Sequence, residues 1–451
     1  MSKISETPRA VRSRRVVTPR GVRPATVWLR EGRIERVTPY EDTPSDGEVE
    51  EFGDAVISPG VVDAHVHINE PGRADWEGFE TATRAAAAGG VTMLAEMPLN
   101  ASPVVTTLDA WNQKIAATEG KLRVDCGFYG GLVPGNIGQI EPMLDAGALG
   151  IKAFLVHSGL DEFPAAGEPE LHGAMPILAR RGIPLLVHAE LEDESGGMPP
   201  APISRLYTDY LASRPSDWEE RAISWMIALC REYKCPVHIV HLATARALPE
   251  LRAAREEGLP LTVETAPHYL FFDSENIPDG ATQFKCAPPI RDAANREGLW
   301  EGLRDGTIDF VGSDHSPCPP SLKNLDSGIF TGAWGGIASL QWTLPIVWSG
   351  AKTRGFSLED VARWTSSAPV RLLGLEKRKG IIAAGIDADL VVWEPEASFT
   401  VTSNTNFHRH KVTPYEGAQL FGPTRATFLR GAKIYENGEF ADESTGEVVT
   451  R

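Results

Sequence analysis

The chain has few of the features that mark secreted, membrane-spanning or nucleic-acid-binding proteins. Its 451 residues include five cysteines, an odd number without zinc-knuckle spacing, which fits a reducing cytoplasm better than a disulfide framework. No apolar run approaches the ~18 residues of a membrane span, and residues 1–20 lack the apolar core of a secretory signal. A net charge of −17 disfavours contact with nucleic acid or anionic membranes. We therefore expect a cytoplasmic protein that binds neither nucleic acid nor membrane.

Glycine-rich phosphate motifs are also absent. We find no Gly-x-Gly-x-x-Gly after an apolar run and no phosphate loop, which weakens a doubly wound open sheet as the fold. Instead, short apolar runs alternate with helical segments through the middle of the chain. The apolar runs span 55–65, 91–97, 124–129, 150–156, 183–188, 237–241, 261–265 and 308–312. The helical segments span 76–88, 108–117, 168–181, 216–232, 243–257 and 292–305. This alternation predicts an α/β fold, a (β/α)8 TIM barrel with its site at the C-terminal ends of the strands.

Both ends of the chain show a different sequence pattern, in which short runs typical of β-strands are separated by turn residues. These runs span 15–18, 26–29 and 33–38 near the start, and 390–393, 399–402 and 426–429 near the end. Neither end alone can bury a good core, so we expect the two to form one small β-sandwich domain. The predicted organisation is residues 1–55 and 376–451 in the β domain and residues 56–375 in the barrel.

A histidine pair, His65 and His67, ends the first apolar run. Alternate side chains of a strand point the same way, so both imidazoles project to one side, about 7 Å apart. Such a pair suits one divalent metal ion. For an isolated His-x-His, two ordinary histidines near a turn are an equally good interpretation.

Four further polar residues end other predicted strands: Lys152, His188, His241 and Asp314. Burial of a lone lysine in an apolar strand lowers its pKa and favours the neutral amine. A neutral amine can react with carbon dioxide, and the resulting carbamate could bridge two metal ions. Taken alone, Lys152 could also be a salt-bridged core lysine, and for His188 or His241 alone an ordinary core histidine is the better interpretation. Six such groups on five strand ends are hard to explain as coincidence.

At this point the sequence resembles a known family. His65, His67, Lys152, His188, His241 and Asp314 match the ligand pattern of the binuclear-metal amidohydrolase superfamily, and more narrowly its dihydroorotase, hydantoinase and allantoinase branch. The resemblance covers nearly the whole chain and implies two divalent metal ions per subunit. Zn²⁺ suits the histidine-rich ligation, although Co²⁺, Mn²⁺ or Fe²⁺ would also fit. It also implies a homo-oligomer, a tetramer, acting on a small-molecule substrate.

The resemblance assigns a role to each ligand. His65 and His67 would hold the more buried ion, and His188 and His241 the more exposed one. Lys152, as N6-carboxylysine, would bridge both ions together with a water or hydroxide. Asp314 would bind the first ion and act as general base, taking the proton of the bridging hydroxide and delivering it to the leaving amide nitrogen.

The substrate is indicated by positions that differ within this branch. Dihydroorotases carry an arginine where this chain has Asn69 and a histidine where it has Cys318, both for the substrate carboxylate. Segments 67–73, 76–81, 97–100, 285–291 and 334–337 resemble allantoinases instead, which implies opening of the neutral hydantoin ring of allantoin to allantoate. Substrate contacts would come from Asn69, Asn100, Ser316 and the backbone of Cys286 and Pro289. Asn100 could equally be a simple turn residue.

His157 stands where hydantoinases carry a tyrosine that steadies the developing oxyanion, five residues after Lys152. It is either a loop histidine or a catalytic donor to the tetrahedral intermediate. Two rival functions remain open. One is a hydantoinase, dihydropyrimidinase or dihydroorotase-like cyclic amide hydrolase, and the other is a non-catalytic assembly scaffold on the same barrel. The six filled ligand positions weigh against the scaffold.

Overall fold

The computed structural model describes residues 10–42, 49–192 and 202–451, and its centre is a succession of parallel strands. β6 (Val61–Val66), β7 (Val91–Glu96) and β8 (Asp125–Phe128) pair in that order. β9 (Gly130–Gly131), β10 (Ile151–Phe154), β11 (Leu185–His188), β12 (Val237–Ile239), β13 (Leu261–Thr265) and β14 (Phe310–Val311) follow in the same way. Only Tyr129 separates β8 from β9. Each predicted apolar run therefore contains a strand, and spatial order follows chain order.

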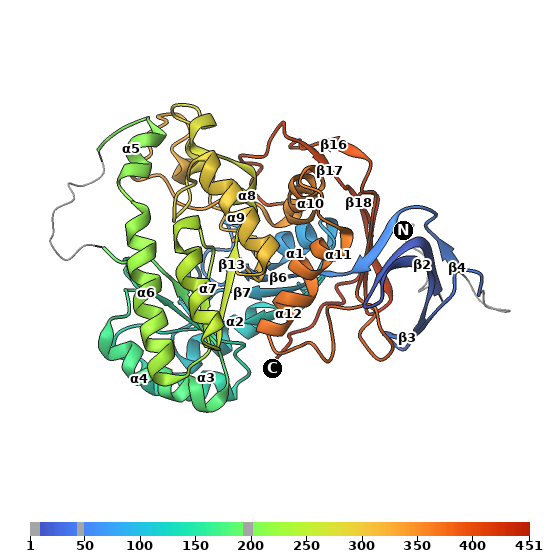
Figure 1. Cartoon of the computed structure of the whole chain (residues 1–451), viewed down its shortest axis with the longest axis horizontal. Coiled ribbons are helices and arrows are strands. Elements are labelled where there is room, and N and C mark those ends of the chain that lie inside the picture. Colours follow the sequence, from blue (N-terminus) through green and yellow to red (C-terminus); the bar gives the residue numbers. More distant parts are fainter. Residues whose placement is uncertain (1–9, 43–48, 193–201) are drawn as a thin grey trace.

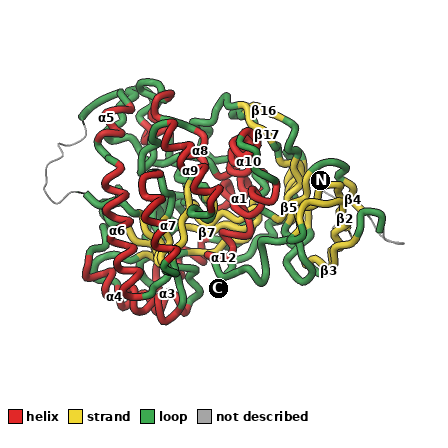
Figure 2. The backbone as a smooth tube through the Cα atoms, in the orientation of Figure 1, coloured by secondary structure: helices red, strands yellow, loops and turns green. Residues whose placement is uncertain are grey.

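The first and last of these strands also approach each other. Val66 forms a parallel bridge with His315, and the His67 N–H donates to the His315 carbonyl at 2.8 Å. Figure 2 shows the strands of this region in the interior with helices outside them. The polar groups at the strand ends are thus brought toward a common region.

Helices connect the strands and cover their outer side (Figure 1). The predicted helices include α2 (Leu108–Ala117) and α4 (Glu168–Arg181) with their expected bounds. Four others differ by a few residues: α1 (Phe79–Ala88), α6 (Ser216–Tyr233), α7 (Leu248–Glu256) and α9 (Ala293–Asp305). α4 begins with Glu168 and Glu170 and ends with Arg180 and Arg181, charges that interact favourably with the helix dipole. The left-handed Gly182 ends it. Within the described residues, no helix combines the length and apolar character needed to cross a bilayer.

Several helices were not predicted. α3 (Ile137–Asp145) contains Pro142, a residue type that disfavours a helix interior. α10 (Thr343–Thr353) buries all of its first six residues, so it shows no clear polar face there. The remaining ones are short: α5 (Tyr207–Ala212), α8 (Pro267–Phe271), α11 (Leu358–Ala362) and α12 (Ala368–Leu372). Short helices give too few turns for a periodic signal.

The two ends of the chain contribute to one nine-stranded sheet. Its strands are β1 (Ala10–Thr18), β2 (Gly21–Arg30), β3 (Arg33–Thr38), β4 (Val49–Glu51), β5 (Val56–Pro59), β15 (Leu390–Trp393), β18 (Thr424–Leu429), β19 (Ala432–Glu436) and β20 (Glu439–Phe440). β5 pairs in parallel with β1 and antiparallel with β15, so it joins the two ends. Figure 1 shows the blue and red strands side by side. A short separate ribbon pairs β16 (Ser398–Thr400) with β17 (Gln419–Phe421).

One apolar cluster joins side chains from both ends, including Val27, Ile57, Leu390 and Phe428. Because the core is built from both ends, neither end alone could bury it, which agrees with the expectation from the sequence. β5 lies in this sheet although its residues were assigned to the barrel segment. The division of the chain at residues 55 and 375 stays a prediction.

Candidate metal centre

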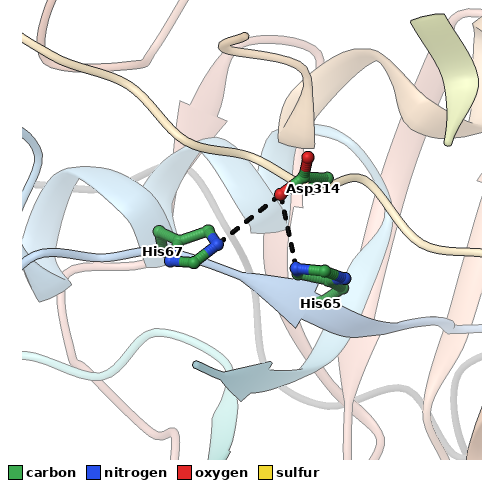
Figure 3. Close-up of side chains that lie close together, drawn as sticks. All are labelled: His65, His67 and Asp314. Atoms are coloured by element: carbon green, nitrogen blue, oxygen red, sulfur yellow. Dashed lines mark ion pairs between the residues drawn. The ribbon is translucent and has the colours of Figure 1, made fainter. Parts of the chain in front are cut away.

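His65, His67 and Asp314 meet at the ends of β6 and β14. The Nε2 atoms of His65 and His67 lie 3.3 and 3.5 Å from Asp314 Oδ1, and Figure 3 shows both rings pointing toward that oxygen. One ligand atom from each residue lies within 4.8 Å of the others, and all three side chains are buried. This arrangement could hold a metal ion.

Backbone geometry aims these side chains. Asp314 has a φ of 44° and His241 a φ of 38°, both in the left-handed region that non-glycine residues rarely adopt. The Ser313 N–H donates to Asp63 Oδ1 at 3.0 Å, and the Ser313 hydroxyl donates to the His65 carbonyl at 3.2 Å. The segment before Asp314 is therefore fixed to β6, and unusual backbone conformations persist at the ligand positions.

Glu264 orients His65. Its carboxylate contacts His65 Nδ1, lies 3.2 Å from His238 Nε2 and accepts the His241 N–H at 3.2 Å. Burial favours a higher pKa for Glu264, but the adjacent His65 and His238 outweigh it and hold the pKa well below its usual range. An ionised Glu264 accepts the Nδ1 proton of His65 and leaves the lone pair on Nε2, facing Asp314. Glu264 was not predicted, and its one sign in the sequence is a lone carboxylate inside a largely apolar run.

His188 and His241 lie beside this group. Their rings are 4.6 Å apart, and the rings of His65 and His241 are 5.3 Å apart. His188 Nε2 lies 2.6 Å from Glu190 Oε2, and Arg214 Nε donates to Glu190 Oε1 at 3.0 Å. Glu190 is fully buried, and it too was missed. His188 therefore donates from Nε2 and keeps its Nδ1 lone pair available.

Three imidazoles of this site, those of His67, His188 and His241, are held neutral. Burial lowers the pKa of His67 and His188 to about 4 and the pKa of His241 well below its usual range. The neutral ring is the form that binds a metal ion.

Lys152 is buried without a hydrogen-bond partner among the described residues. Its Nζ lies 4.8 Å from the ring centroid of Phe154, and that ring stacks on His188 at 4.4 Å. Burial lowers the pKa of Lys152 to about 7, although Glu264 and Asp314 act to raise it. Among the described residues no salt bridge is found for Lys152, which disfavours the interpretation as a salt-bridged core lysine. Histidine nitrogens, a carboxylate and an unpartnered buried amine are a donor set that fits a divalent metal centre.

A cavity of about 470 Å³ opens next to these groups. Five of the six expected ligands line it: His65, His67, His188, His241 and Asp314. Asn100, Ser316 and His157 also line it, together with Leu99, Phe154, Tyr210, Arg214, Lys285 and Trp334. The cavity is the place where a small molecule could meet the metal centre.

Three of the expected substrate residues, Asn69, Cys286 and Pro289, are not among the described residues that line the cavity. Asn69 is buried, and its Nδ2 donates to the Pro317 carbonyl at 3.3 Å. The prediction that it contacts substrate is therefore not supported by its place in the structure. His157 sits at the cavity with its side chain 61% exposed, and its Nδ1 accepts the Gly159 N–H at 3.1 Å.

Comparisons with known proteins agree with this geometry. A sequence model of the amidohydrolase family matches residues 56–414. The chain is 47% identical to the allantoinase of Streptomyces avermitilis, over 99% of this chain and 100% of the relative. It is 43% identical to the allantoinase of Arabidopsis thaliana, over 97% of this chain and 90% of the relative. The solved L-hydantoinase (dihydropyrimidinase) from Arthrobacter aurescens has a TM-score of 0.88 and 31% identity, covering 98% of this chain and 99% of that one. The resemblance found in the sequence is confirmed, and the chain belongs to the amidohydrolase family, in the branch that contains the allantoinases.

Proposed function

We propose that the chain hydrolyses allantoin to allantoate. One observation carries this proposal: a chain that matches an allantoinase over its full length also gathers five of the six expected metal ligands, four histidines and Asp314, around one cavity. In the reaction, a water oxygen bonds to a ring carbonyl carbon and the adjacent ring C–N bond breaks. The product is an open-chain carboxylate.

The parallel strands form a closed (β/α)8 barrel in this proposal, and the chain ends form a β-sandwich beside it. The strand order and the Val66–His315 bridge support closure. Closure would bring the C-terminal ends of all the strands around one cavity, where the candidate ligands lie.

Two divalent ions, Zn²⁺ being the best match to the histidine-rich donors, would be held by this chain. His65, His67 and Asp314 would hold one ion, and His188 and His241 the other. The unprotonated Nζ of Lys152 would add to carbon dioxide, lose a proton and become a carbamate with one oxygen for each ion. When bound, such ions lower the pKa of a water molecule and polarise the carbonyl under attack.

Asp314 is the proton carrier in this proposal. Its ionised form is favoured, because His65 and His67 outweigh burial and hold its pKa well below the usual range. The carboxylate accepts the proton of the attacking water and passes it to the leaving amide nitrogen. His157 stays a proposed donor to the oxyanion. Since its Nδ1 accepts the Gly159 N–H, its Nε2 is the nitrogen that carries a proton. That Nε2 lies 3.4 Å from Asp161 Oδ1, so donation to an oxyanion would require the ring to leave this contact.

A neutral ring suits the charges of the cavity. Arg214 is already bound to Glu190, and Lys285 Nζ donates to the carbonyls of Phe330 and Ala333. Both lining cations already have partners within the protein, which disfavours a role for either in binding a substrate carboxylate. This supports allantoin over dihydroorotate, while Asn100 and Ser316 offer uncharged polar groups to the ring.

A substrate panel tests the proposal. Zinc-loaded protein is given allantoin, hydantoin, dihydrouracil and dihydroorotate, and ring opening is followed for each. We expect kcat/KM to be highest for allantoin. A higher value for hydantoin or dihydrouracil would assign the chain to the hydantoinases instead, and no turnover of any ring would favour the scaffold. The homotetramer and the cytoplasmic location stay predictions from the sequence.

A further inference from the structure

Residues 320–335, here called the roof segment, form one wall of the cavity. Apart from the short 3₁₀ helix η4 (Pro320–Lys323), no helix or strand is found in this described segment. Five of its residues line the cavity: Leu322, Gly332, Ala333, Trp334 and Gly335. The Trp334 ring packs edge-on against Trp76 at 4.8 Å, and its Nε1 donates to the Ser316 carbonyl at 3.3 Å. The place of this segment therefore sets the shape of the cavity.

Two lysines hold the roof segment by its backbone carbonyls. Lys323 Nζ donates to the Trp334 carbonyl at 2.9 Å and to the Lys285 carbonyl at 3.0 Å. Lys285 Nζ donates to the carbonyls of Phe330 and Ala333 at 2.6 and 2.7 Å. These four bonds link both ends of the roof segment to each other and to the segment that follows η3 (Thr282–Phe284).

The two ammonium groups are costly to place here. Lys323 is 4% exposed, and burial lowers the pKa of both lysines to about 8. In the described part of the chain, the hydrogen bonds found for both groups go to carbonyl oxygens. Four bonds from charged donors offset the loss of hydration. Their removal would leave four carbonyls without these donors, three of them in the roof segment. The bond from the Trp334 N–H to the Leu322 carbonyl at 2.7 Å would remain.

We propose that Lys285 and Lys323 are positioning residues that fasten the roof segment over the cavity and so set how tightly the substrate is held. They act on binding rather than on the bond-breaking step, because neither ammonium group is directed at the metal ligands. This inference rests on the proposed hydrolysis of a ring bound in the cavity.

The test compares Lys285→Met and Lys323→Met, which keep side-chain length but lose the donor, with wild type. Lys352→Met is the matched control, because Lys352 Nζ also donates to a carbonyl, that of Pro395 at 3.1 Å, and Lys352 is not among the described residues that line the cavity. We expect KM for allantoin to rise at least fivefold in both variants, with kcat within twofold and zinc content unchanged. Amide hydrogen exchange of residues 320–335 should quicken at least tenfold in both, but not in the control. Lys285→Arg, which keeps a charged donor, should restore much of the lost protection.

Two results would overturn the proposal. One is a KM within twofold of wild type with unchanged exchange in the roof segment. The other is an equal fall in kcat and zinc content, which would place the lysines in support of the metal centre. If wild-type protein fails to open allantoin, the proposed function fails, and the exchange measurement still decides whether the lysines fasten this segment. Lys285 is the less buried of the two, so Lys285→Met keeps the test decisive if Lys323→Met does not fold.

Discussion

Replacing Glu190 with glutamine tests whether a residue that orients His188, without being a metal ligand itself, contributes to metal binding. Glu190 is fully buried and accepts from His188 at 2.6 Å and from Arg214 at 3.0 Å. Glutamine keeps the shape but has one acceptor oxygen, so either His188 or Arg214 must face an amide N–H. Breaking a buried ion pair costs about 3–5 kcal/mol, and the retained hydrogen bond returns about 1 kcal/mol. We expect the unfolding free energy to fall by roughly 2–4 kcal/mol.

The same change should weaken one metal position. Loss of a carboxylate that orients a ligating histidine typically costs 10–100-fold in affinity, or about 1.4–2.7 kcal/mol. Zinc content measured by mass spectrometry at graded free zinc should show two ions per wild-type subunit. The variant should lose the ion assigned to His188 and His241 at concentrations that still fill the position at His65 and His67.

Asp309→Asn is the matched control. Asp309 accepts two bonds of 3.0 Å from Arg255 just before β14, at the opposite end of that strand from Asp314. This variant should lose stability but keep both ions. If Glu190→Gln binds both ions with wild-type affinity, then Glu190 does not orient a metal ligand and the role given to His188 is wrong.

Three other predictions concern the same centre. Lys152→Ala should lose zinc and activity and recover part of both with added short-chain carboxylic acids, whereas full activity without them would refute the carbamate bridge. Asp314→Ala should keep the far-ultraviolet circular dichroism spectrum but lower kcat at least a thousandfold, and near-normal turnover would remove it as the proton carrier. The pKa of Glu190 is lowered to about 2, so its stabilisation is complete above its ordinary value of 4.5 and is lost as the pH falls toward 2. Melting of metal-free protein should therefore show the gap between wild type and Glu190→Gln closing over that range, and a constant gap would contradict the assignment.

Much of the fold was predictable because its elements carry periodic signals. The strands of the centre are short apolar runs, and α2 and α4 show a polar face, a starting cap and a charged end. α10 was missed because its first six residues, 343–348, are all buried, so the apolar residues there follow no helical period. Candidate ligands were predictable because strand ends converge in space, a rule that needs no side-chain detail.

The site was harder to predict at two kinds of position. At one, the local backbone conformation sets where a side chain points, and at the other, the contact joins residues that are far apart in the sequence. Asn69 was expected on the cavity side because it continues the alternation of His65 and His67. Its φ of 69° breaks that alternation, and the side chain turns to Pro317 instead. Glu190 gave no signal in the sequence, and the lone carboxylate of Glu264 in its strand did not show which imidazole it supports. A carboxylate supports an imidazole only when folding brings the two together.

The position of β5 has a consequence for the newly made chain. β5 pairs with β1, but its other neighbour, β15, begins only at Leu390. At a synthesis rate of 5–20 residues per second, that edge of β5 stays unpaired for roughly 15–65 s. Val56 and Ile57, both fully buried in the finished fold, lie on this open edge. An unpaired apolar edge is a template for pairing with other chains. We therefore expect the unfinished chain to aggregate more readily than the finished fold, and slower synthesis to lengthen that exposure.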